Sequence, residues 1–400
     1  MSDRSQQPRR VRTAAPSRPR RAVTAVAALA AALAVAGTLP AGAAESHGSR
    51  EVVRKGLERL VTDDRFPAAL AATIDRDGRT RDYTAGVADV KTRAKVPVDG
   101  QVRAGSNTKA FTATVVLQLV GEGKVQLDAP IEKYLPNLVR GKGIDGRKIT
   151  VRQLLQHTSG LPEYTNFLGE EAILGKGRHT YHQPRELLDL ALAHKADFAP
   201  GTSWSYSNTN YVLAGLLIEK VTGRPVAEQI TQRIIDRIGL RHTYFPGVGD
   251  QGIREAHPRG YFAAKPGAPL EDITEMDPSW TWSAGQLVST PGDLNRFFSE
   301  LIDGKLLRPA ELTQMRTTVK VPKEFDSGSG IRFGLGLTST PLSCGGLMWG
   351  HRGDTPGYHT RTGVTVDGRA VTTAVTASPA PTPKGLAHAD AVLDTTLCEK

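Results

Sequence analysis

The chain has 400 residues, of which 39% are hydrophobic and 23% are charged. This is an ordinary globular composition, and the length is sufficient to bury a large core. The formal net charge is +10, but residues 1–43 alone hold seven arginines and one acid. Only four net positive charges remain in the rest of the chain, which attract a polyanion weakly, so we expect no nucleic-acid partner.

The first predicted element is a secretory leader over residues 1–43. A basic start is followed by an uncharged Ala/Val/Leu run at 22–39 and by Ala41-Gly42-Ala43, a small-x-small cleavage pattern. This order is typical of a signal peptide, whereas a nucleic-acid arm needs no apolar run and a membrane anchor needs no cleavage site. We expect cleavage near Ala43, secretion, and no stable membrane anchor afterwards. The Sec and twin-arginine export routes both remain open.

The next elements are predicted in chain order. Apolar spacing predicts a helix over 51–61, and strands over 68–74 and 80–87 flank Asp77-Gly78, a hairpin turn signal. The middle of the chain carries helical patterns at 109–122, 151–156, 185–193, 211–221 and 226–237. The far end mirrors the beginning, with strands at 360–366 and 370–377 around Asp367-Gly368 and a last helix over 386–397.

These elements predict an α/β fold of the α+β type. One antiparallel sheet with flanking helices is built from both ends of the chain, and a mostly helical lobe is inserted between them. We expect a single domain over 44–398, with a sheet lobe at about 50–105 and 300–398 and a helical lobe at about 107–298. The arrangement favours an active site between the two lobes.

The strongest chemical signal is Gly105-Ser106-Asn107-Thr108-Lys109. Positions i and i+3 share one face of a helix, so the Ser106 hydroxyl and the Lys109 amine can meet. A serine needs an adjacent base to act as a nucleophile, and a lysine serves when burial lowers its pKa. Lys109 precedes an apolar stretch at 111–119, which favours such burial. The plainer alternative is a helix N-cap serine followed by a solvated lysine.

Two further segments supply candidate site residues. Tyr206-Ser207-Asn208 lies in a Gly/Pro-led loop before a helix, where a tyrosine can transfer a proton and an asparagine can hold an amide. His351-Arg352-Gly353 follows a predicted strand at 347–349, and a glycine there lets an extended substrate approach the strand edge. Alone, the first is equally an ordinary capping loop and the second an ordinary packing site.

The two cysteines, Cys344 and Cys398, both lie in the exported part of the chain. An even pair in an oxidising compartment favours a disulfide over two buried thiols. No CxxC or HExxH pattern occurs, so the sequence predicts neither a metal site nor a cofactor.

Taken together, the Ser-x-x-Lys, Tyr-x-Asn and His-x-Gly segments resemble the penicillin-recognising serine hydrolases, the class C β-lactamase-like superfamily. The branch that looks most similar is that of the secreted D-alanyl-D-alanine carboxypeptidases, because the third motif begins with His and a late cysteine pair is present. The resemblance implies that Ser106 is acylated and that Lys109 or Tyr206 takes its proton. It also implies that Asn208 positions the acyl amide and that Trp280 walls the cleft. The N–H groups of Ser106 and Asp354 would form the oxyanion hole.

The third motif departs from that branch at Arg352 and Asp354, where the branch has threonines. The arginine that holds the substrate carboxylate in the branch is also missing from 338–343. Arg352 is therefore a candidate replacement anchor, although strand alternation points it away from the face that His351 uses. Asp354 is a candidate for neutralising Arg352 or for repelling an anionic terminus.

From these features we expect an exported D-alanyl-D-alanine carboxypeptidase that acts on peptidoglycan stem peptides through a Ser106 acyl-enzyme. β-Lactams are expected as covalent inhibitors, and the protein is expected to be a monomer. An esterase, a D-aminopeptidase or D-peptidase, or a β-lactamase with the same machinery remains an alternative. A non-catalytic sensor of β-lactams or cell-wall fragments is a second alternative.

Overall fold

The computed structural model describes residues 41–399, apart from 266 and 327. The predicted leader therefore lies outside the described residues, except for 41–43. These three begin helix α1 (Ala41–Thr62), which starts ten residues before the predicted helix. In the described chain, no helix combines the length and the apolar character needed to cross a membrane.

The centre of the structure is a nine-stranded sheet whose strands come from both ends of the described chain. Every strand pair in it is antiparallel, as predicted. Its path runs from β2 (Thr80–Gly86) through β1 (Ala68–Ile74), β15 (Ala370–Thr376), β14 (Tyr358–Val364), β12 (Leu347–Gly350), β11 (Thr338–Pro341) and β10 (Arg332–Phe333) to β9 (Val319–Lys320), while β13 (Arg352–Thr355) pairs with β14. Both hairpins predicted at Asp-Gly turns form, as β1–β2 and β14–β15.

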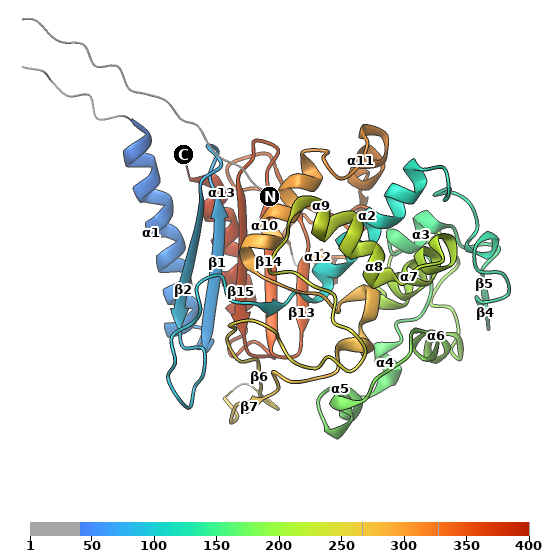
Figure 1. Cartoon of the computed structure of the whole chain (residues 1–400), viewed down its shortest axis with the longest axis horizontal. Helices are drawn as coiled ribbons and strands as arrows, with labels where there is room; N and C mark the ends of the chain where they lie inside the picture. The colour runs from blue at the N-terminus through green and yellow to red at the C-terminus, as the bar shows by residue number, and fades with distance from the viewer. Residues whose placement is uncertain (1–40, 266, 327, 400) are drawn as a thin grey trace, which may run out of the picture. The chain divides into compact units, whose positions relative to one another are not determined.

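Helices cover both faces of this sheet (Figure 1). On the outer face, α1 and α13 (Gly385–Cys398) pack through Leu57 and Val392 against Val375 of β15. On the inner face, Asn295 of α10 (Pro291–Ile302) is hydrogen-bonded to Thr372, whose side chain points to the opposite face of β15 from that of Val375. Alternation along β15 thus separates an outer, α13-facing side from an inner side that faces the rest of the molecule.

The inserted lobe is organised around α2 (Thr108–Gly121), which is buried along most of its length. Phe111 of α2 stacks on Phe297 of α10 with ring centroids 3.6 Å apart, which joins the lobe to the sheet. The other helices of the described chain are α3 (Val151–Leu155), α4 (Thr165–Leu168), α5 (Glu170–Ile173), α6 (Pro184–Leu192), α7 (Asn208–Thr222), α8 (Val226–Ile230), α9 (Asp236–Ile238), α11 (Pro309–Arg316) and α12 (Lys323–Asp326).

The prediction of a mostly helical middle holds up to α9 but not beyond it. Residues 240–290 form loops, short turns and small two-stranded pairs. Within this stretch β6 (Tyr261–Phe262) pairs with β7 (Glu271–Asp272), and β8 (Val288–Ser289) pairs with the earlier β3 (Val102–Arg103). Elsewhere, β4 (Arg140–Gly141) and β5 (Ile144–Asp145) form a separate small pair. The 240–290 stretch packs on the sheet lobe, where Tyr261 joins the α1 and β15 core, so packing rather than helical periodicity determines its path.

Candidate active site

Ser106 lies in a single 3-10 turn, Gly105–Asn107, between β3 and α2. Its neighbours hold this turn firmly, because Asn107 is fully buried and donates from Nδ2 to Thr360 Oγ1 of β14 at 2.7 Å. Gly105 has a φ of +53°, a conformation that a residue with a side chain rarely adopts. The turn therefore presents Ser106 as a partly exposed hydroxyl above a buried base.

Lys109 is fully buried and its amine makes three hydrogen bonds. Nζ lies 2.9 Å from Ser106 Oγ, 2.6 Å from Asn208 Oδ1 and 2.8 Å from the carbonyl of Ala284. Burial lowers the pKa of Lys109 to about 7, and the negative charge of Glu163 opposes this shift. The predicted serine–lysine contact is thus present, and about half of the lysine is deprotonated at neutral pH.

Tyr206 lies beside the Lys109 amine. The Lys109 amine is 4.8 Å from the centre of its ring. Burial raises the pKa of Tyr206 well above its ordinary value, although the neighbouring Ser106 hydroxyl opposes the shift. Tyr206 is therefore a neutral phenol at physiological pH, able to donate a proton.

Asn208 is the first residue of α7, three residues before the predicted start of that helix. Its Oδ1 accepts from Lys109, and its Nδ2 donates to Glu163 Oε1 at 3.1 Å. The backbone N–H of Asn208 also donates to Glu163. The two ends of the amide are therefore oriented by a lysine on one side and a carboxylate on the other.

Sequence reasoning missed Glu163. It follows α3 by eight residues in a largely apolar segment, Leu161-Pro162-Glu163-Tyr164, and a single acid in such a segment was the available signal. Its carboxylate is partly exposed and accepts three N–H groups, two from Asn208 and one from Thr165 at 3.1 Å. The tertiary fold places this negative charge close to Lys109, with only the Asn208 side-chain amide between them.

The β13 strand passes very close to the Ser106 turn. A Cβ atom on Gly353 would lie 2.0 Å from the Ala104 carbonyl oxygen and 2.7 Å from Asn107 Nδ2, so only glycine fits at this position. His351 precedes β13 and is buried, with Nδ1 donating to the Arg352 carbonyl at 2.5 Å. Burial, together with the positive charge of Lys109, lowers the pKa of His351 to about 3, so the imidazole is neutral.

The register of β13 corrects the expected role of Arg352. Arg352 pairs across the sheet with Arg361, whereas Gly353 pairs with Thr360, which faces the Ser106 turn. Arg352 therefore lies on the outer face, where its guanidinium is 3.3 Å from Asp390 of α13. This geometry gives Arg352 a structural ion pair instead of a position from which to anchor a substrate carboxylate.

Asp354 lies on the same outer face and has partners of its own. Its Oδ1 is 2.5 Å from His359 Nδ1 and 2.9 Å from Arg361 Nη1. The Arg361 guanidinium and His359 hold the pKa of the Asp354 carboxyl well below its ordinary value. The carboxylate is thus neutralised by Arg361, and it does not neutralise Arg352 as expected.

The remaining predicted residues lie around this centre. Trp280 is nearly buried in a short turn, four residues before Ala284, and its carbonyl accepts the Tyr164 hydroxyl. The predicted disulfide is present: Cys344 in the β11–β12 connection is bonded to Cys398 at the end of α13.

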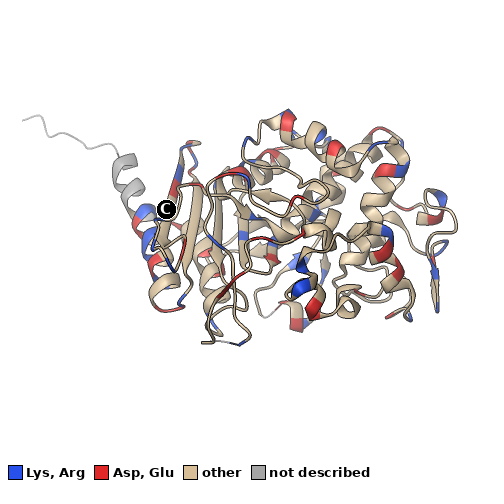
Figure 2. Ribbon diagram, turned by 60° about the horizontal axis from the view of Figure 1, so that its bottom comes forward, with Lys and Arg blue, Asp and Glu red and all other residues tan. Residues whose placement is uncertain are grey.

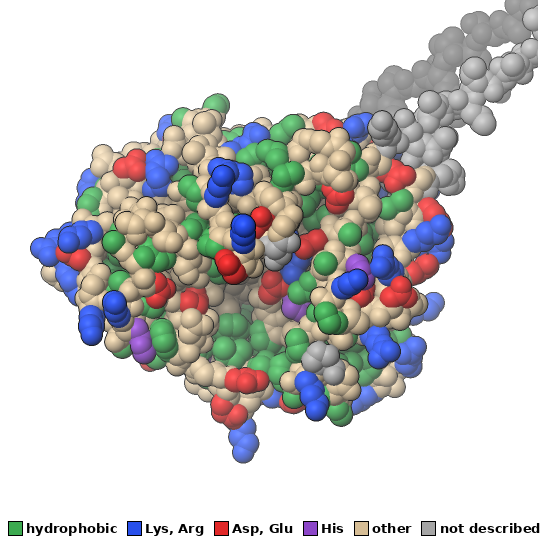
Figure 3. Space-filling view, turned by 180° about the vertical axis from the view of Figure 1, so that it is seen from behind, with side chains coloured by type: hydrophobic (Ala, Val, Ile, Leu, Met, Phe, Trp, Pro, Cys, Tyr) green, Lys and Arg blue, Asp and Glu red, His purple; other side chains and the backbone are tan. Residues whose placement is uncertain are grey.

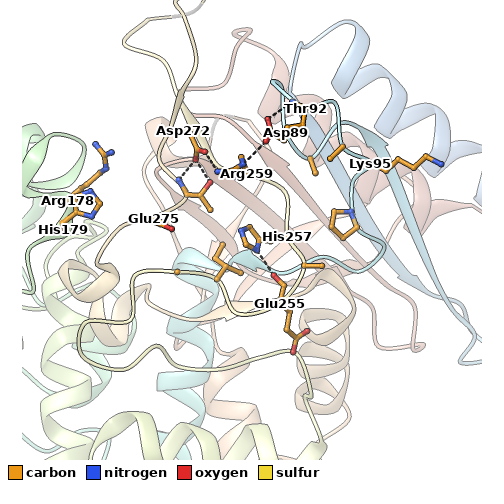
Figure 4. Close-up of a pocket in the computed structure, with 17 residues that line it drawn as sticks. Asp89, Thr92, Lys95, Arg178, His179, Glu255, His257, Arg259, Asp272 and Glu275 are labelled. Carbon is orange, nitrogen blue, oxygen red and sulfur yellow. Dashed lines mark hydrogen bonds and ion pairs between the residues drawn. The ribbon is translucent and has the colours of Figure 1, made fainter.

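The surface carries charges of both signs in close alternation. Figure 2 shows Lys and Arg close to Asp and Glu on several helices, and both signs mix on the face shown in Figure 3. A cavity of about 820 Å³ opens between residues 88–97 and 252–275, and none of the predicted site residues lines it. In this cavity Arg259 pairs with Asp89 and Asp272 (Figure 4), so much of its charge is already matched.

Comparison with known proteins gives the same fold. The family model described as Beta-lactamase matches residues 51–397. The crystal structure of a D-stereospecific amidohydrolase from Streptomyces sp. matches with a TM-score of 0.77 and 40% identity, over 85% of this chain and 97% of that one. The D-amino acid amidase from Ochrobactrum anthropi SV3, complexed with L-phenylalanine amide, matches with a TM-score of 0.76 and 27% identity, over 88% and 97%.

Among curated sequences, Protein flp of Staphylococcus aureus strain N315 is 28% identical over 211 residues, which is 53% of this chain and 41% of flp. The chain thus spans about two fifths of the length of the first curated relatives it matches. The resemblance to the penicillin-recognising superfamily and the α+β fold are both confirmed, while a particular closeness to D-alanyl-D-alanine carboxypeptidases is not. The chain belongs to the Beta-lactamase family of serine hydrolases.

Proposed function

We propose that this protein hydrolyses amides of D-amino acids that carry a free amino group, through an acyl-enzyme on Ser106. Lys109 takes the Ser106 proton as Oγ bonds to the amide carbon, and Tyr206 protonates the nitrogen as the C–N bond breaks. The N–H groups of Ser106 and Asp354 would stabilise the oxyanion. Water then releases the acid and restores the Ser106 hydroxyl.

The protonation states support these roles. A base with a pKa of about 7 is about half unprotonated at neutral pH, so a large fraction of Lys109 is able to accept the serine proton. The phenol of Tyr206, with its pKa raised by burial, keeps its proton until the leaving nitrogen needs it. Lys109 Nζ lies 2.9 Å from Ser106 Oγ and 4.8 Å from the centre of the Tyr206 ring, so the two groups are close enough to share the proton traffic of one reaction.

The observation that carries the substrate assignment is the position of Glu163. Its partly exposed carboxylate is bonded to Asn208, the residue expected to hold the acyl amide. Within the described residues it accepts N–H groups and forms no ion pair with a lysine or arginine. A substrate ammonium group beside the acyl carbon would provide the missing cation. The D configuration is supported by the 40% identity to the D-stereospecific amidohydrolase.

The carboxypeptidase that the sequence favoured is less well supported. Its substrate needs a cation to hold the terminal carboxylate, and Arg352 is paired with Asp390 on the outer face of the sheet. The neutral His351 adds no positive charge near Ser106. The alternative of a D-aminopeptidase or D-peptidase, which recognises an amino terminus, fits the acidic environment better.

The test compares four substrates: D-phenylalanine amide, its L enantiomer, its N-acetyl derivative and an N-acylated D-Ala-D-Ala peptide. We expect kcat/KM to be highest for the free D-amide. Glu163→Gln should lower that value by roughly 10- to 150-fold, which corresponds to a charge-assisted bond of about 1.5–3 kcal/mol. The same variant should affect the N-acetyl substrate much less.

Other results would assign another function. Preference for the N-acylated D-Ala-D-Ala peptide would assign the protein a carboxypeptidase function instead. Turnover of only a short-chain aryl ester or a chromogenic cephalosporin would indicate an esterase or a β-lactamase. Stable labelling of Ser106 by a β-lactam without any turnover would indicate a sensor. Ser106→Ala is the control in each case and should abolish both labelling and turnover.

A further inference from the structure

His157 holds the chain on both sides of Tyr206. Its carbonyl accepts the N–H of Ser205 at 3.0 Å, and its Nδ1 accepts the N–H of Ser207 at 3.1 Å. Its ring also stacks on the Tyr206 ring, with centroids 4.4 Å apart and planes 29° apart. Three separate contacts from one residue thus fix the backbone before Tyr206, the backbone after it, and the phenol ring itself.

The hydrogen bonds also determine the tautomer of His157. A backbone N–H is always a donor, so Nδ1 must be the unprotonated nitrogen and Nε2 carries the proton. Burial lowers the pKa of His157 well below its ordinary value, and the charge of Lys109 acts in the same direction. His157 is therefore a neutral, flat acceptor that leaves the Tyr206 proton in place.

His157 is held in this position at a conformational cost. It is fully buried and has a φ of +62°, in the left-handed region that non-glycine residues adopt uncommonly, although His does so more often than most. Asn210 reinforces it, with Nδ2 at 3.2 Å from Nδ1 and with Oδ1 bonded to Ser159. Strained residues of this kind persist where the surroundings over-determine them, often at functional sites.

We propose that His157 is a positioning residue that holds the Tyr206 phenol in line for proton delivery to the leaving nitrogen. The inference rests on the role of Tyr206 in the proposed function, but it does not depend on the natural substrate. A displacement of about 1 Å at a reacting group costs up to about 100-fold in rate. Loss of His157 should therefore slow steps that need the Tyr206 proton and spare steps that do not.

The test uses His157→Asn, because asparagine tolerates the left-handed conformation and its Oδ1 can replace Nδ1 as the acceptor for Ser207. Acylation by benzylpenicillin, an amide whose nitrogen must be protonated, is followed by intact-mass spectrometry. Acylation by p-nitrophenyl acetate, whose leaving group needs no proton, is the comparison. Tyr206→Phe and the double variant complete a mutant cycle.

We expect His157→Asn to slow penicillin acylation by roughly 10- to 100-fold, and ester acylation by less than about 3-fold. In the Tyr206→Phe background the same change should cost less than about 2-fold, because the group it positions is absent. His388→Asn is the matched control. It removes a partly buried imidazole of α13 that pairs with Asp64, and it should leave both rates unchanged.

Additive losses in the double variant, or equal losses on the two acylating agents, would overturn the proposal. Rates are normalised to the Ser106 sites titrated by a fluorophosphonate, so that misfolded protein is not counted. If His157→Asn does not fold, His157→Gln takes its place in the cycle. Failure of the proposed substrate class would appear separately, as absence of D-amide turnover by the wild-type enzyme with normal penicillin acylation.

Discussion

At the scale of single residues, the active centre depends on one buried amine whose charge is balanced between burial and a nearby carboxylate. Burial favours neutral Lys109, and Glu163 favours the ammonium form. Because Asn208 lies between them, Glu163 acts through space and through the orientation of that amide. The pKa of Lys109 is therefore lowered mainly by burial and adjusted by a residue 54 positions further along the chain.

This balance predicts the pH dependence of acylation. Only unprotonated Lys109 can accept the Ser106 proton, so kcat/KM for a neutral ester should rise with pH, with a midpoint near pH 7, and level off about one pH unit higher. Glu163→Gln removes the charge that raises the pKa of Lys109, so the midpoint should move to lower pH. The measurement is a kcat/KM profile from about pH 5 to 9.

The matched control is Glu219→Gln. It changes another partly buried glutamate, which lies on α7 about three helical turns after Asn208. Its profile should coincide with that of the wild type. A midpoint that stays in place or moves upward in Glu163→Gln would contradict the assignment of Lys109 as the titrating base.

At the scale of elements, the site depends on the close approach of strand β13 to the Ser106 turn. Gly353 packs against the Ala104 carbonyl, while Asn107 and Thr360 tie the same turn to β14. The strand and the turn come from segments about 250 residues apart in the chain. Their contact brings the N–H groups proposed for the oxyanion hole to one place.

Gly353→Ala should break this approach. The new methyl group would lie 2.0 Å from a backbone oxygen, so strand or turn must move, at a cost of about 1–3 kcal/mol in stability. We expect kcat/KM to fall by roughly 100-fold, since the oxyanion donors move with the strand. Steady-state kinetics and thermal melting measure the two effects.

Gly247→Ala is the matched control, because a Cβ atom there meets no atom within 4 Å and the backbone φ is not positive. It should leave both activity and melting temperature close to those of the wild type. If Gly353→Ala retained full activity, β13 could not supply an oxyanion donor at Asp354.

At the scale of the whole described molecule, the two ends of the chain are joined in one sheet, and the disulfide secures the last helix. The bond between Cys344 and Cys398 links the β11–β12 connection to the end of α13 across 54 residues. Asp390 of α13 in turn pairs with Arg352 and Arg361 behind β13. The outer face thus supports the strand from which the active site is built.

Replacing both cysteines by serine should lower the free energy of unfolding by about 4 kcal/mol in the chain-entropy model for a loop of this length. In a chain of this size we expect a decrease in melting temperature of about 5 °C. Activity at 25 °C should remain within about twofold, since the disulfide touches none of the catalytic side chains. Calorimetry of the variant, and of the wild type with and without dithiothreitol, measures the effect.

Two results would contradict this account of the disulfide. Equal melting temperatures for oxidised and reduced wild type would show that the disulfide does not contribute to the stability of the fold. A large loss of activity in the folded double variant would show instead that α13 controls the geometry of β13.

The amino-acid sequence by itself determined the features that depend on local spacing. Ser106 and Lys109 are three positions apart, so any helical turn at this point brings them together. The Asp-Gly turns at Gly78 and Gly368 specify hairpins, because glycine tolerates the positive φ that such turns require. Tyr206 and Asn208 were likewise recognisable from the loop that precedes α7.

Only the tertiary structure decided which distant side chains complete the site. Glu163 and His157 reach Asn208 and Tyr206 from a segment some 45–50 residues earlier, and no local periodicity encodes that pairing. The face on which Arg352 lies was decided by the register of β13 against β14, since a shift of one residue reverses every side chain of a strand. Register and long-range packing are set by the burial of the whole sheet, and short motifs carry little information about either.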